Sequence, residues 1–220
     1  MSPDYSYTAY GLGIASCLPC PRLRSGSGPP DVFVRCGSLP DGLPGARSGG
    51  VCYQATSNQL LLSVPGVARF LVSDGREILV ERAANADDDD VRLFLLGPAL
   101  GALLQQRGLL VFEGSAIEAS RGAVALLGHS GAGKSTLAAW FHQRGCAVLA
   151  DDLCVVSPAG SGESLLQPGY PQLDLWPDAC QEMGLPLEEM RRVRPLLEKL
   201  ALIVDGNRPA CPVPLRRIYV

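Results

Sequence analysis

An octapeptide near the middle of the chain has the residue types and spacing needed to bind phosphate. Residues 128–135 are Gly-His-Ser-Gly-Ala-Gly-Lys-Ser, which fits the P-loop pattern Gly-x-x-x-x-Gly-Lys-Ser. Glycines let successive backbone N–H groups turn toward phosphate oxygens where a Cβ would collide. The lysine is a flexible point charge for the β- and γ-phosphates, and the serine hydroxyl is suited to Mg²⁺. The motif predicts a nucleotide-binding loop consisting of Gly128, His129, Ser130, Gly131, Ala132, Gly133, Lys134, Ser135 and Thr136.

Lysine is scarce in this protein, which makes its positions informative. Of the 19 basic residues, 17 are arginine and two are lysine, Lys134 and Lys199. One of the two therefore stands where a point charge is needed to hold phosphate, a task for which the rigid fork of arginine is less suited.

Two adjacent aspartates follow the next apolar segment along the chain. Asp151 and Asp152 lie 17 and 18 residues after Lys134, directly behind the apolar residues 147–150. In a parallel α/β sheet ligands gather at the carboxyl ends of the strands, beside the phosphate loop. One carboxylate could hold Mg²⁺ and the other could accept a proton from an attacking hydroxyl. We expect Asp151 on the metal side, whereas Asp152 either accepts the proton or caps the following turn.

The elements around these residues alternate between strand and helix patterns. Residues 109–119 are expected to be extended, 123–127 form an uncharged buried strand, 134–144 a helix, and 147–150 a second strand. This βαβ order is typical of an α/β nucleotide-binding domain. We therefore predict an α/β fold with a P-loop nucleotide-binding core over residues 87–220, preceded by a small β-rich domain over residues 1–86.

The remaining segments carry conventional structural signals. Short strands are expected at 32–35, 59–64, 68–72 and 77–81, with Asp74-Gly75 turning a hairpin. Four acids at positions 87–90 are expected to cap a helix that continues to Arg107, with a kink or a restart at Gly97-Pro98. Residues 157–172 are expected to form a loop and 187–204 a charged helix. The last residues, 215–220, are expected to form an edge strand, which suggests oligomer pairing or a missing C-terminal segment.

Composition excludes several classes of protein. A net charge of −3 over 220 residues, with 47% hydrophobic and 19% charged residues, argues against disorder and against a general nucleic-acid binder with a broad basic face. The longest apolar stretch, residues 93–104, is well short of the roughly 20 needed to span a bilayer. We expect a soluble, cytoplasmic protein without a secretory signal. Its eight cysteines, Cys17 and Cys20 included, are expected to be reduced rather than to form a metal or redox site.

The residues around the P-loop resemble the catalytic domain of bacterial HPr kinase/phosphorylase. The resemblance rests on the P-loop, on a helix that closes in Gln143-Arg144-Gly145, and on a strand that ends in Ala150-Asp151-Asp152. The element Phe112-Glu113-Gly114-Ser115-Ala116 matches a strand that precedes the P-loop in that family. The rest of the chain is most similar to shorter HPr-kinase-related proteins, some of which accompany lasso-peptide biosynthesis and phosphorylate the precursor peptide on serine.

The resemblance implies a kinase that uses ATP and Mg²⁺. It aligns Asp152 with the general base and Ser135 with the Mg²⁺-ligating serine, with Asp151 beside both. It also places Glu113 where the family usually has a catalytic histidine, and a carboxylate there could hold metal or accept a proton. Three interpretations remain: a serine kinase acting on a lasso-type precursor peptide, the same chemistry on free serine or HPr protein, and a nucleotide-binding regulatory protein without turnover. The resemblance allows a homo-oligomer, and neither nucleic acid nor membrane is an expected partner.

Overall fold

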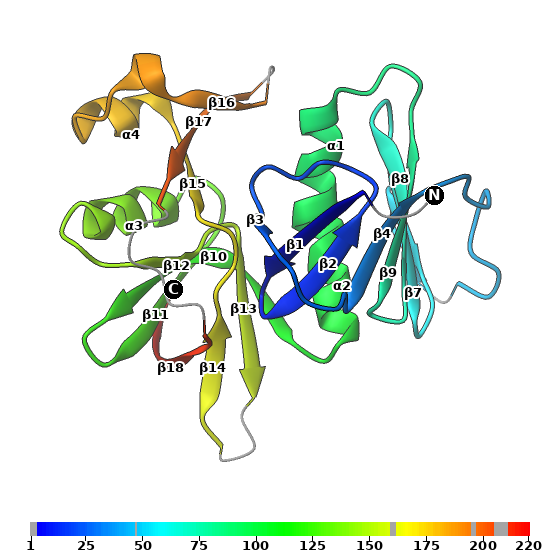
Figure 1. Ribbon diagram of the computed structural model, residues 1–220, viewed down its shortest axis with the longest axis horizontal. Coiled ribbons are helices and arrows are strands. Elements are labelled where there is room, and N and C mark those ends of the chain that lie inside the picture. The colour runs from blue at the N-terminus through cyan, green and yellow to red at the C-terminus, as the bar shows by residue number, and fades with distance from the viewer. Residues whose placement is uncertain (1–3, 47, 159–161, 195–196, 205–210) are drawn as a thin grey trace. The chain divides into compact units, whose positions relative to one another are not determined.

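The chain folds as two units of similar size. The structure is a computed structural model that describes residues 4–46, 48–158, 162–194, 197–204 and 211–220. The first unit comprises Met1–Leu109 and the second Leu110–Val220 (Figure 1). The P-loop motif and both aspartates of the predicted site lie in the second unit.

The first unit is built on one mixed sheet. Within its described residues nine strands follow the order β3-β1-β2-β4-β9-β8-β7-β6-β5. β2 pairs with β4 and β4 with β9 in parallel, whereas the other neighbours are antiparallel. The strands are β1 (Tyr5–Ala9), β2 (Leu12–Ser16), β3 (Arg24–Ser25), β4 (Val32–Cys36), β5 (Ser48–Gly49), β6 (Tyr53–Ala55), β7 (Gln59–Val64), β8 (Ala68–Ser73) and β9 (Glu77–Arg82).

The predicted hairpin at Asp74-Gly75 is confirmed. Both residues have positive φ, 55° and 61°, as a two-residue type I′ turn requires, and Arg76 N–H donates to Ser73 O at 3.0 Å. The hairpin joins β8 to β9, and alternate residues point to opposite faces of these strands. Phe70 and Ile78 are fully buried on one of those faces.

The segment that follows the hairpin in sequence forms one continuous helix with a π-helical turn in its middle. α1 (Asp88–Phe94) continues into a π-helical turn, η1 (Leu95–Ala99), and then into α2 (Leu100–Gln106). Pro98 lies inside the π turn, where its missing N–H breaks the regular ladder, so the α-helix is interrupted at the predicted Gly97-Pro98. η1 and α2 pack on β8, and α2 also contacts β9. This helix therefore belongs to the first unit, although the sequence grouped residues 87–107 with the P-loop.

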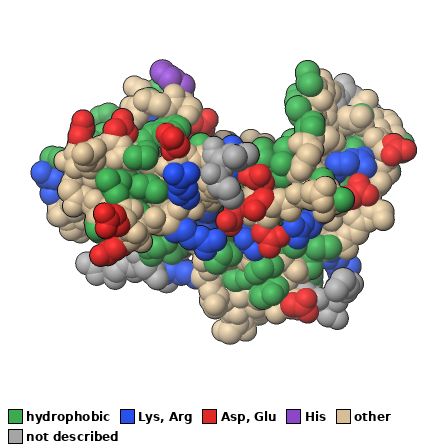
Figure 2. All heavy atoms as spheres, turned by 90° about the horizontal axis from the view of Figure 1, so that it is seen from above, with side chains coloured by type: hydrophobic (Ala, Val, Ile, Leu, Met, Phe, Trp, Pro, Cys, Tyr) green, Lys and Arg blue, Asp and Glu red, His purple; other side chains and the backbone are tan. Residues whose placement is uncertain are grey.

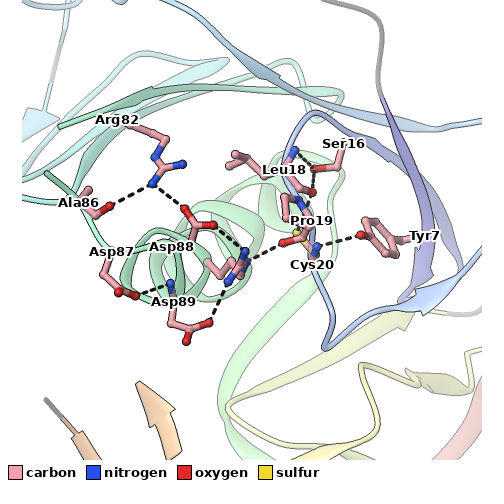
Figure 3. A network of polar contacts seen from close by, with 11 residues as sticks. Tyr7, Ser16, Leu18, Pro19, Cys20, Arg82, Ala86, Asp87, Asp88 and Asp89 are labelled. Atoms are coloured by element: carbon pink, nitrogen blue, oxygen red, sulfur yellow. Dashed lines mark hydrogen bonds and ion pairs between the residues drawn. The ribbon is translucent and has the colours of Figure 1, made fainter. Parts of the chain in front are cut away.

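The acidic run at positions 87–90 has the structural role predicted for it. Asp87 is the N-cap of α1 and accepts a hydrogen bond from Asp89 N–H at 2.8 Å. Arg92, on the next turn, forms ion pairs with Asp88 and Asp89 at 2.9 Å each and donates through Nε to Pro19 O at 2.6 Å (Figure 3). These contacts tie the helix start to the loop after β2.

The expectation that all cysteines are reduced is wrong for one pair. Cys17 and Cys36 form a disulfide, with their Cα atoms 6.4 Å apart. Cys17 follows β2 and Cys36 ends β4, and Cys17 N–H donates to Val34 O at 3.0 Å, so the parallel pairing of these strands brings the two sulfurs together. Cys20, the other member of the Cys-x-x-Cys pair, is a free and buried thiol.

The second unit contains a closed ring of five strands. β10 pairs with both β11 and β13, and in the described residues the ring runs β10-β11-β18-β14-β13. Small and aliphatic residues fill the barrel, among them Ala116, Ala125, Cys154 and Leu166. The strands are β10 (Leu110–Ala119), β11 (Gly122–Leu127), β13 (Leu153–Pro158), β14 (Ser164–Gln167) and β18 (Val213–Tyr219).

One expectation for this unit is wrong because barrel closure recruits a segment with a weak strand signal. The segment 157–172 is expected from the sequence to be a loop, and its residues 159–161 lie outside the described part of the chain. It contains the end of β13 and all of β14, whose Leu166 is completely buried in the barrel. The strand predicted at 215–220 is the end of β18: Val213 and Pro214 pair with β14, whereas residues 215–219 pair in parallel with β11.

A strand-loop-helix-strand unit carries the P-loop motif, close to the bounds predicted from sequence. β11 leads into the glycine-rich loop, α3 (Lys134–His142) follows, and β12 (Val148–Ala150) is the next strand. β10 lies between β11 and β12 and is antiparallel to both. β11 and β12 therefore run in the same direction, and their carboxyl ends meet at one edge, where the loop and the two aspartates lie (Figure 1).

A smaller sheet covers α3 and replaces the predicted helix at 187–204. It has the order β15-β17-β16, with β15 (Gln172–Leu175), β16 (Arg191–Arg194) and β17 (Leu197–Ile203), joined by α4 (Pro177–Glu182) and a 3₁₀ turn, η2 (Leu187–Glu189). Leu173, Leu175 and Leu200 pack with Ala138 and Ala139 of α3. The expected helix at 187–204 is wrong for the described residues: β17 pairs with β15, and Leu200 and Leu202, on one face of that strand, pack toward α3.

No helix in the described parts of the chain has the length and apolar character required to cross a bilayer.

On the face shown in Figure 2, lysine and arginine side chains are interspersed with aspartate and glutamate.

Candidate functional site

The glycine-rich loop has a backbone that only glycine adopts readily. Gly128, Gly131 and Gly133 have φ values of 143°, 85° and 84°, in the region where L side chains are strained. Gly133 is the N-cap of α3. A Cβ at Gly131 or Gly133 would meet no atom within 4 Å and would enter the cavity that both residues line. The loop thus leaves open space in front of the α3 N-terminus, where backbone N–H groups can meet an anion.

Lys134 is folded against the loop that precedes it. Its Nζ donates to the carbonyl oxygens of Gly128 at 2.7 Å and His129 at 2.9 Å, and lies 3.3 Å from Glu113 Oε1. An ammonium group has three N–H donors, so these contacts use all of them. The Glu113 side chain is 64% exposed, which makes its ion pair the weakest of the three and the first that a phosphate oxygen would displace.

Asp151 is the centre of a hydrogen-bond network that joins three elements. Its Oδ1 accepts from Ser135 Oγ at 2.9 Å, on the first turn of α3, and from Ser115 Oγ at 2.6 Å, on β10. Its Oδ2 accepts from Asp174 N–H at 3.1 Å, on β15. The P-loop serine and the first aspartate, predicted from sequence as Mg²⁺ ligands, are therefore in direct contact.

The environment of Asp151 opposes its ionisation. The residue is only 3% exposed, and this burial, together with the neighbouring Asp152 carboxylate, raises the pKa of Asp151 to about 7. The hydrogen bonds from Ser115, the Asp174 N–H and Ser135 act in the opposite direction. A cation beside Asp151 would favour the charged form, because it would offset both the burial and the repulsion.

Asp152 adopts a conformation unusual for a residue with a side chain. Its φ is 62°, a left-handed geometry that aspartate and asparagine tolerate better than most residues. The backbone turns there between β12 and β13, while Asp152 O accepts from Gly114 N–H at 3.1 Å. Both Asp151 and Asp152 line the same cavity.

A single cavity of about 310 Å³ collects most of the predicted site residues. Those that line it are Glu113, Ser130, Gly131, Gly133, Lys134, Ser135, Thr136, Asp151 and Asp152. The other predicted loop residues act through their backbones: Gly128 and His129 offer carbonyl oxygens to Lys134, and Ala132 N–H donates to His129 O at 3.2 Å.

The rest of the cavity lining consists of residues that the sequence did not predict as part of the site. They come from β15, α4 and β17 and are Asp174, Leu175, Trp176, Asp178, Ala179, Glu182 and Lys199. Only one of them carried a usable signal, since Lys199 is the second of two lysines in a chain rich in arginine. The others became neighbours of the P-loop through the pairing of β15 with β17.

The donor set at the loop fits a magnesium-bound nucleotide. Ser135 Oγ and the Asp151 carboxylate are hard oxygen donors in mutual contact, beside an open cradle of N–H groups and a lysine. Among the described residues there is no group of three or more His, Cys, Asp or Glu side chains that could hold a metal. Mg²⁺ usually binds through one or two protein oxygens together with phosphate and water, and Ser135 and Asp151 could supply such oxygens.

Comparison with known proteins assigns no family to this chain: no protein-family model matches it, and no curated protein matches it. Any statement about its activity therefore rests on the residues of the site.

Proposed function

We propose that this protein is an ATP- and Mg²⁺-dependent kinase, related to HPr kinase/phosphorylase and most similar to the HPr-kinase-like proteins of lasso-peptide biosynthesis. It transfers the γ-phosphoryl group to a serine hydroxyl on a precursor peptide in the cytoplasm. One observation carries the proposal: Lys134, Ser135, Asp151 and Asp152 converge on one cavity in front of the glycine-rich loop.

Each of these residues has a distinct task in the proposed reaction. The loop N–H groups and Lys134 hold the β- and γ-phosphates, with Lys134 exchanging its contact to Glu113 for a phosphate oxygen. Ser135 and Asp151 would hold Mg²⁺, which supplies charge stabilisation between the β- and γ-phosphates when bound. Asp152 accepts the proton of the attacking serine hydroxyl as the new P–O bond forms and the bond to the β-phosphate oxygen breaks.

The geometry of the two aspartates supports this division of labour. Asp151 is buried against Ser135 and is confined to the metal side of the loop. Asp152 is less buried, lies on the cavity wall and can meet an acceptor that enters from solvent. A metal ligand and a proton acceptor need these different environments.

The proposal is tested by incubating the protein with γ-labelled ATP and Mg²⁺ and a set of acceptors: serine-containing peptides, free serine and HPr protein. We expect label on a peptide serine, and we expect EDTA to abolish transfer. Lys134→Ala should lower transfer by ~10³-fold, because it removes the charge on the phosphates. Arg121→Gln, which removes a positive charge elsewhere in this unit, should leave transfer unchanged.

Other outcomes separate the remaining interpretations. If only free serine or HPr protein is labelled, the protein is still a serine kinase, but its substrate is not a precursor peptide. ATP binding that depends on Lys134, with no acceptor labelled, would favour a nucleotide-binding regulatory protein. ATP binding that is the same in wild type and Lys134→Ala would refute the assignment of the loop.

A further inference from the structure

The cavity has an unbalanced charge. Within the described residues its carboxylates come from Glu113, Asp151, Asp152, Asp174, Asp178 and Glu182, whereas its cations are Lys134 and Lys199. The two cations are the only two lysines of the chain. A nucleotide brings several negative charges into this acidic site, so its binding and reaction depend on the two ammonium groups that can offset the repulsion.

Lys199 is directed into the cavity by the pairing of β17 with β15. Leu175 pairs with Leu200, which places Lys199 opposite Trp176 in the antiparallel register. Leu200 packs in the core between the sheet and α3, and side chains alternate along a strand, so Lys199 faces the other side. Asp174, which pairs with Ala201 two residues along β17, lines the cavity from that same face.

Trp176 helps to hold the lysine there. Lys199 Nζ lies 5.7 Å from the centre of the Trp176 ring, within the range of a cation–π interaction. The ring is 43% exposed and also lines the cavity. The sheet is coupled to the site, because Asp174 N–H on β15 donates to Asp151. Lys199 and Asp174, the backbone partner of Asp151, thus lie on paired strands of the same sheet.

The two lysines reach the cavity from different elements. Lys134 belongs to the glycine-rich loop, and Lys199 belongs to β17, outside that loop. A phosphoryl group in transfer moves away from the loop toward the acceptor, with negative charge on its three equatorial oxygens. A cation that does not belong to the loop can follow that movement, whereas Lys134 is held by the loop carbonyls.

We propose that Lys199 is a catalytic residue, whose ammonium group contacts the equatorial oxygens of the γ-phosphoryl group as it passes to the serine hydroxyl. Lys199 stays protonated throughout and supplies charge only; the serine proton goes to Asp152 and the electron pair of the broken bond to ADP. This inference rests on the proposed function of the site.

The test compares Lys199→Gln with Lys199→Arg and with a matched control, Arg192→Gln. Arg192 pairs with Leu200 on the neighbouring strand, is exposed and does not line the cavity, so its replacement removes one charge nearby. For Lys199→Gln we expect kcat to fall by about 100-fold with less than about a threefold change in ATP affinity. Lys199→Arg should recover at least about tenfold of that loss, and Arg192→Gln should match the wild type. Thermal unfolding confirms that each variant is folded.

A second measurement needs no acceptor. ADP with Mg²⁺ and aluminium fluoride mimics the phosphoryl group in transfer, so Lys199→Gln should weaken its binding by about 100-fold while ATP binding stays unchanged. Equal affinity of the wild type and Lys199→Gln for this complex would overturn the role of Lys199. It would leave the proposed kinase intact, provided that Lys134→Ala still loses ATP binding. Loss of ATP and aluminium-fluoride binding to the same extent in Lys199→Gln would make Lys199 a ground-state contact and would also refute the proposal.

Discussion

Two runs of aspartate in this protein have similar sequences and opposite environments. In the first unit, Asp88 and Asp89 form ion pairs with Arg92, and Asp87 caps a helix. In the second unit, the hydrogen bonds to Asp151 come from two hydroxyl groups and one backbone N–H, and the residue is nearly completely buried. The first arrangement neutralises its charge within the fold. The second holds a carboxylate in a position that favours a cation from solution.

The difference shows how to separate structural from functional acids. An acid that is paired with an arginine contributes to folding stability through that ion pair, so replacing the acid changes the stability of the fold. A buried acid held by neutral donors is unfavourable for the isolated fold, and perturbed groups of this kind cluster at functional sites. The comparison makes four predictions, given from the largest expected effect to the smallest.

The largest difference in kcat is expected between Asp152→Asn and Asp88→Asn. Asparagine retains the tolerance for the left-handed backbone at position 152 but cannot accept the serine proton, so kcat should fall by at least ~10³-fold with ATP affinity retained. Asp88→Asn should leave kcat unchanged. Phosphorylation rates and ATP titration of both variants measure this, and a large loss of ATP affinity in Asp152→Asn would instead place that residue in the metal site.

Asp151 should make the stability of the protein depend on pH. Its folded-state pKa is raised, to about 7 from an ordinary 3.8, so its contribution to stability is present at low pH and is lost as the pH rises through about 7. The expected loss is on the order of a few kcal/mol, and added Mg²⁺ should reduce it.

Urea unfolding at about pH 5.5 and about pH 8 measures the change, with Asp151→Asn as the control. That variant has no titrating group at the position and should lose this part of the pH dependence. The idea fails if wild type and Asp151→Asn show the same dependence on pH.

Arg92→Met should destabilise the first unit without affecting catalysis. The Arg92 side chain is 15% exposed and has three partners, so we expect a loss of about 1–3 kcal/mol and an unchanged kcat. Arg35→Met is the matched control: the Arg35–Glu77 pair is about half exposed and should contribute under about 0.5 kcal/mol. Equal effects of the two variants in urea unfolding would contradict the distinction.

The smallest effect is expected at Glu113. Glu113→Gln removes the carboxylate that competes with phosphate for Lys134, and because this ion pair is exposed, ATP affinity should rise by only about two- to fivefold. ATP titration measures the gain. A substantial fall in kcat in the same variant would show that Glu113 takes part in the reaction itself.

Local features were predictable because the residues responsible are close together in the sequence. The hairpin turn at Asp74-Gly75, the helix cap at Asp87 and the helix interruption at Pro98 each depend on residues within a few positions. The same holds for the P-loop spacing, which places Lys134 and Ser135 at the start of α3. The sequence by itself therefore determined the loop, its lysine and the two aspartates behind the next strand.

The rest was decided by the tertiary structure. The hydrogen-bond partners of Asp151 are distant in sequence: Ser115 is 36 positions away and Asp174 is 23 positions away. The Cys17–Cys36 disulfide likewise follows from the pairing of β2 with β4. Residues 191–194 and 197–203, predicted as part of a helix, form strands because β17 pairs with β15 and α3 offers a surface for Leu200 and Leu202. Pairing energies of this kind depend on which segments meet, and no short window of sequence contains that information. The wall that carries Lys199 therefore became visible only when the chain was folded.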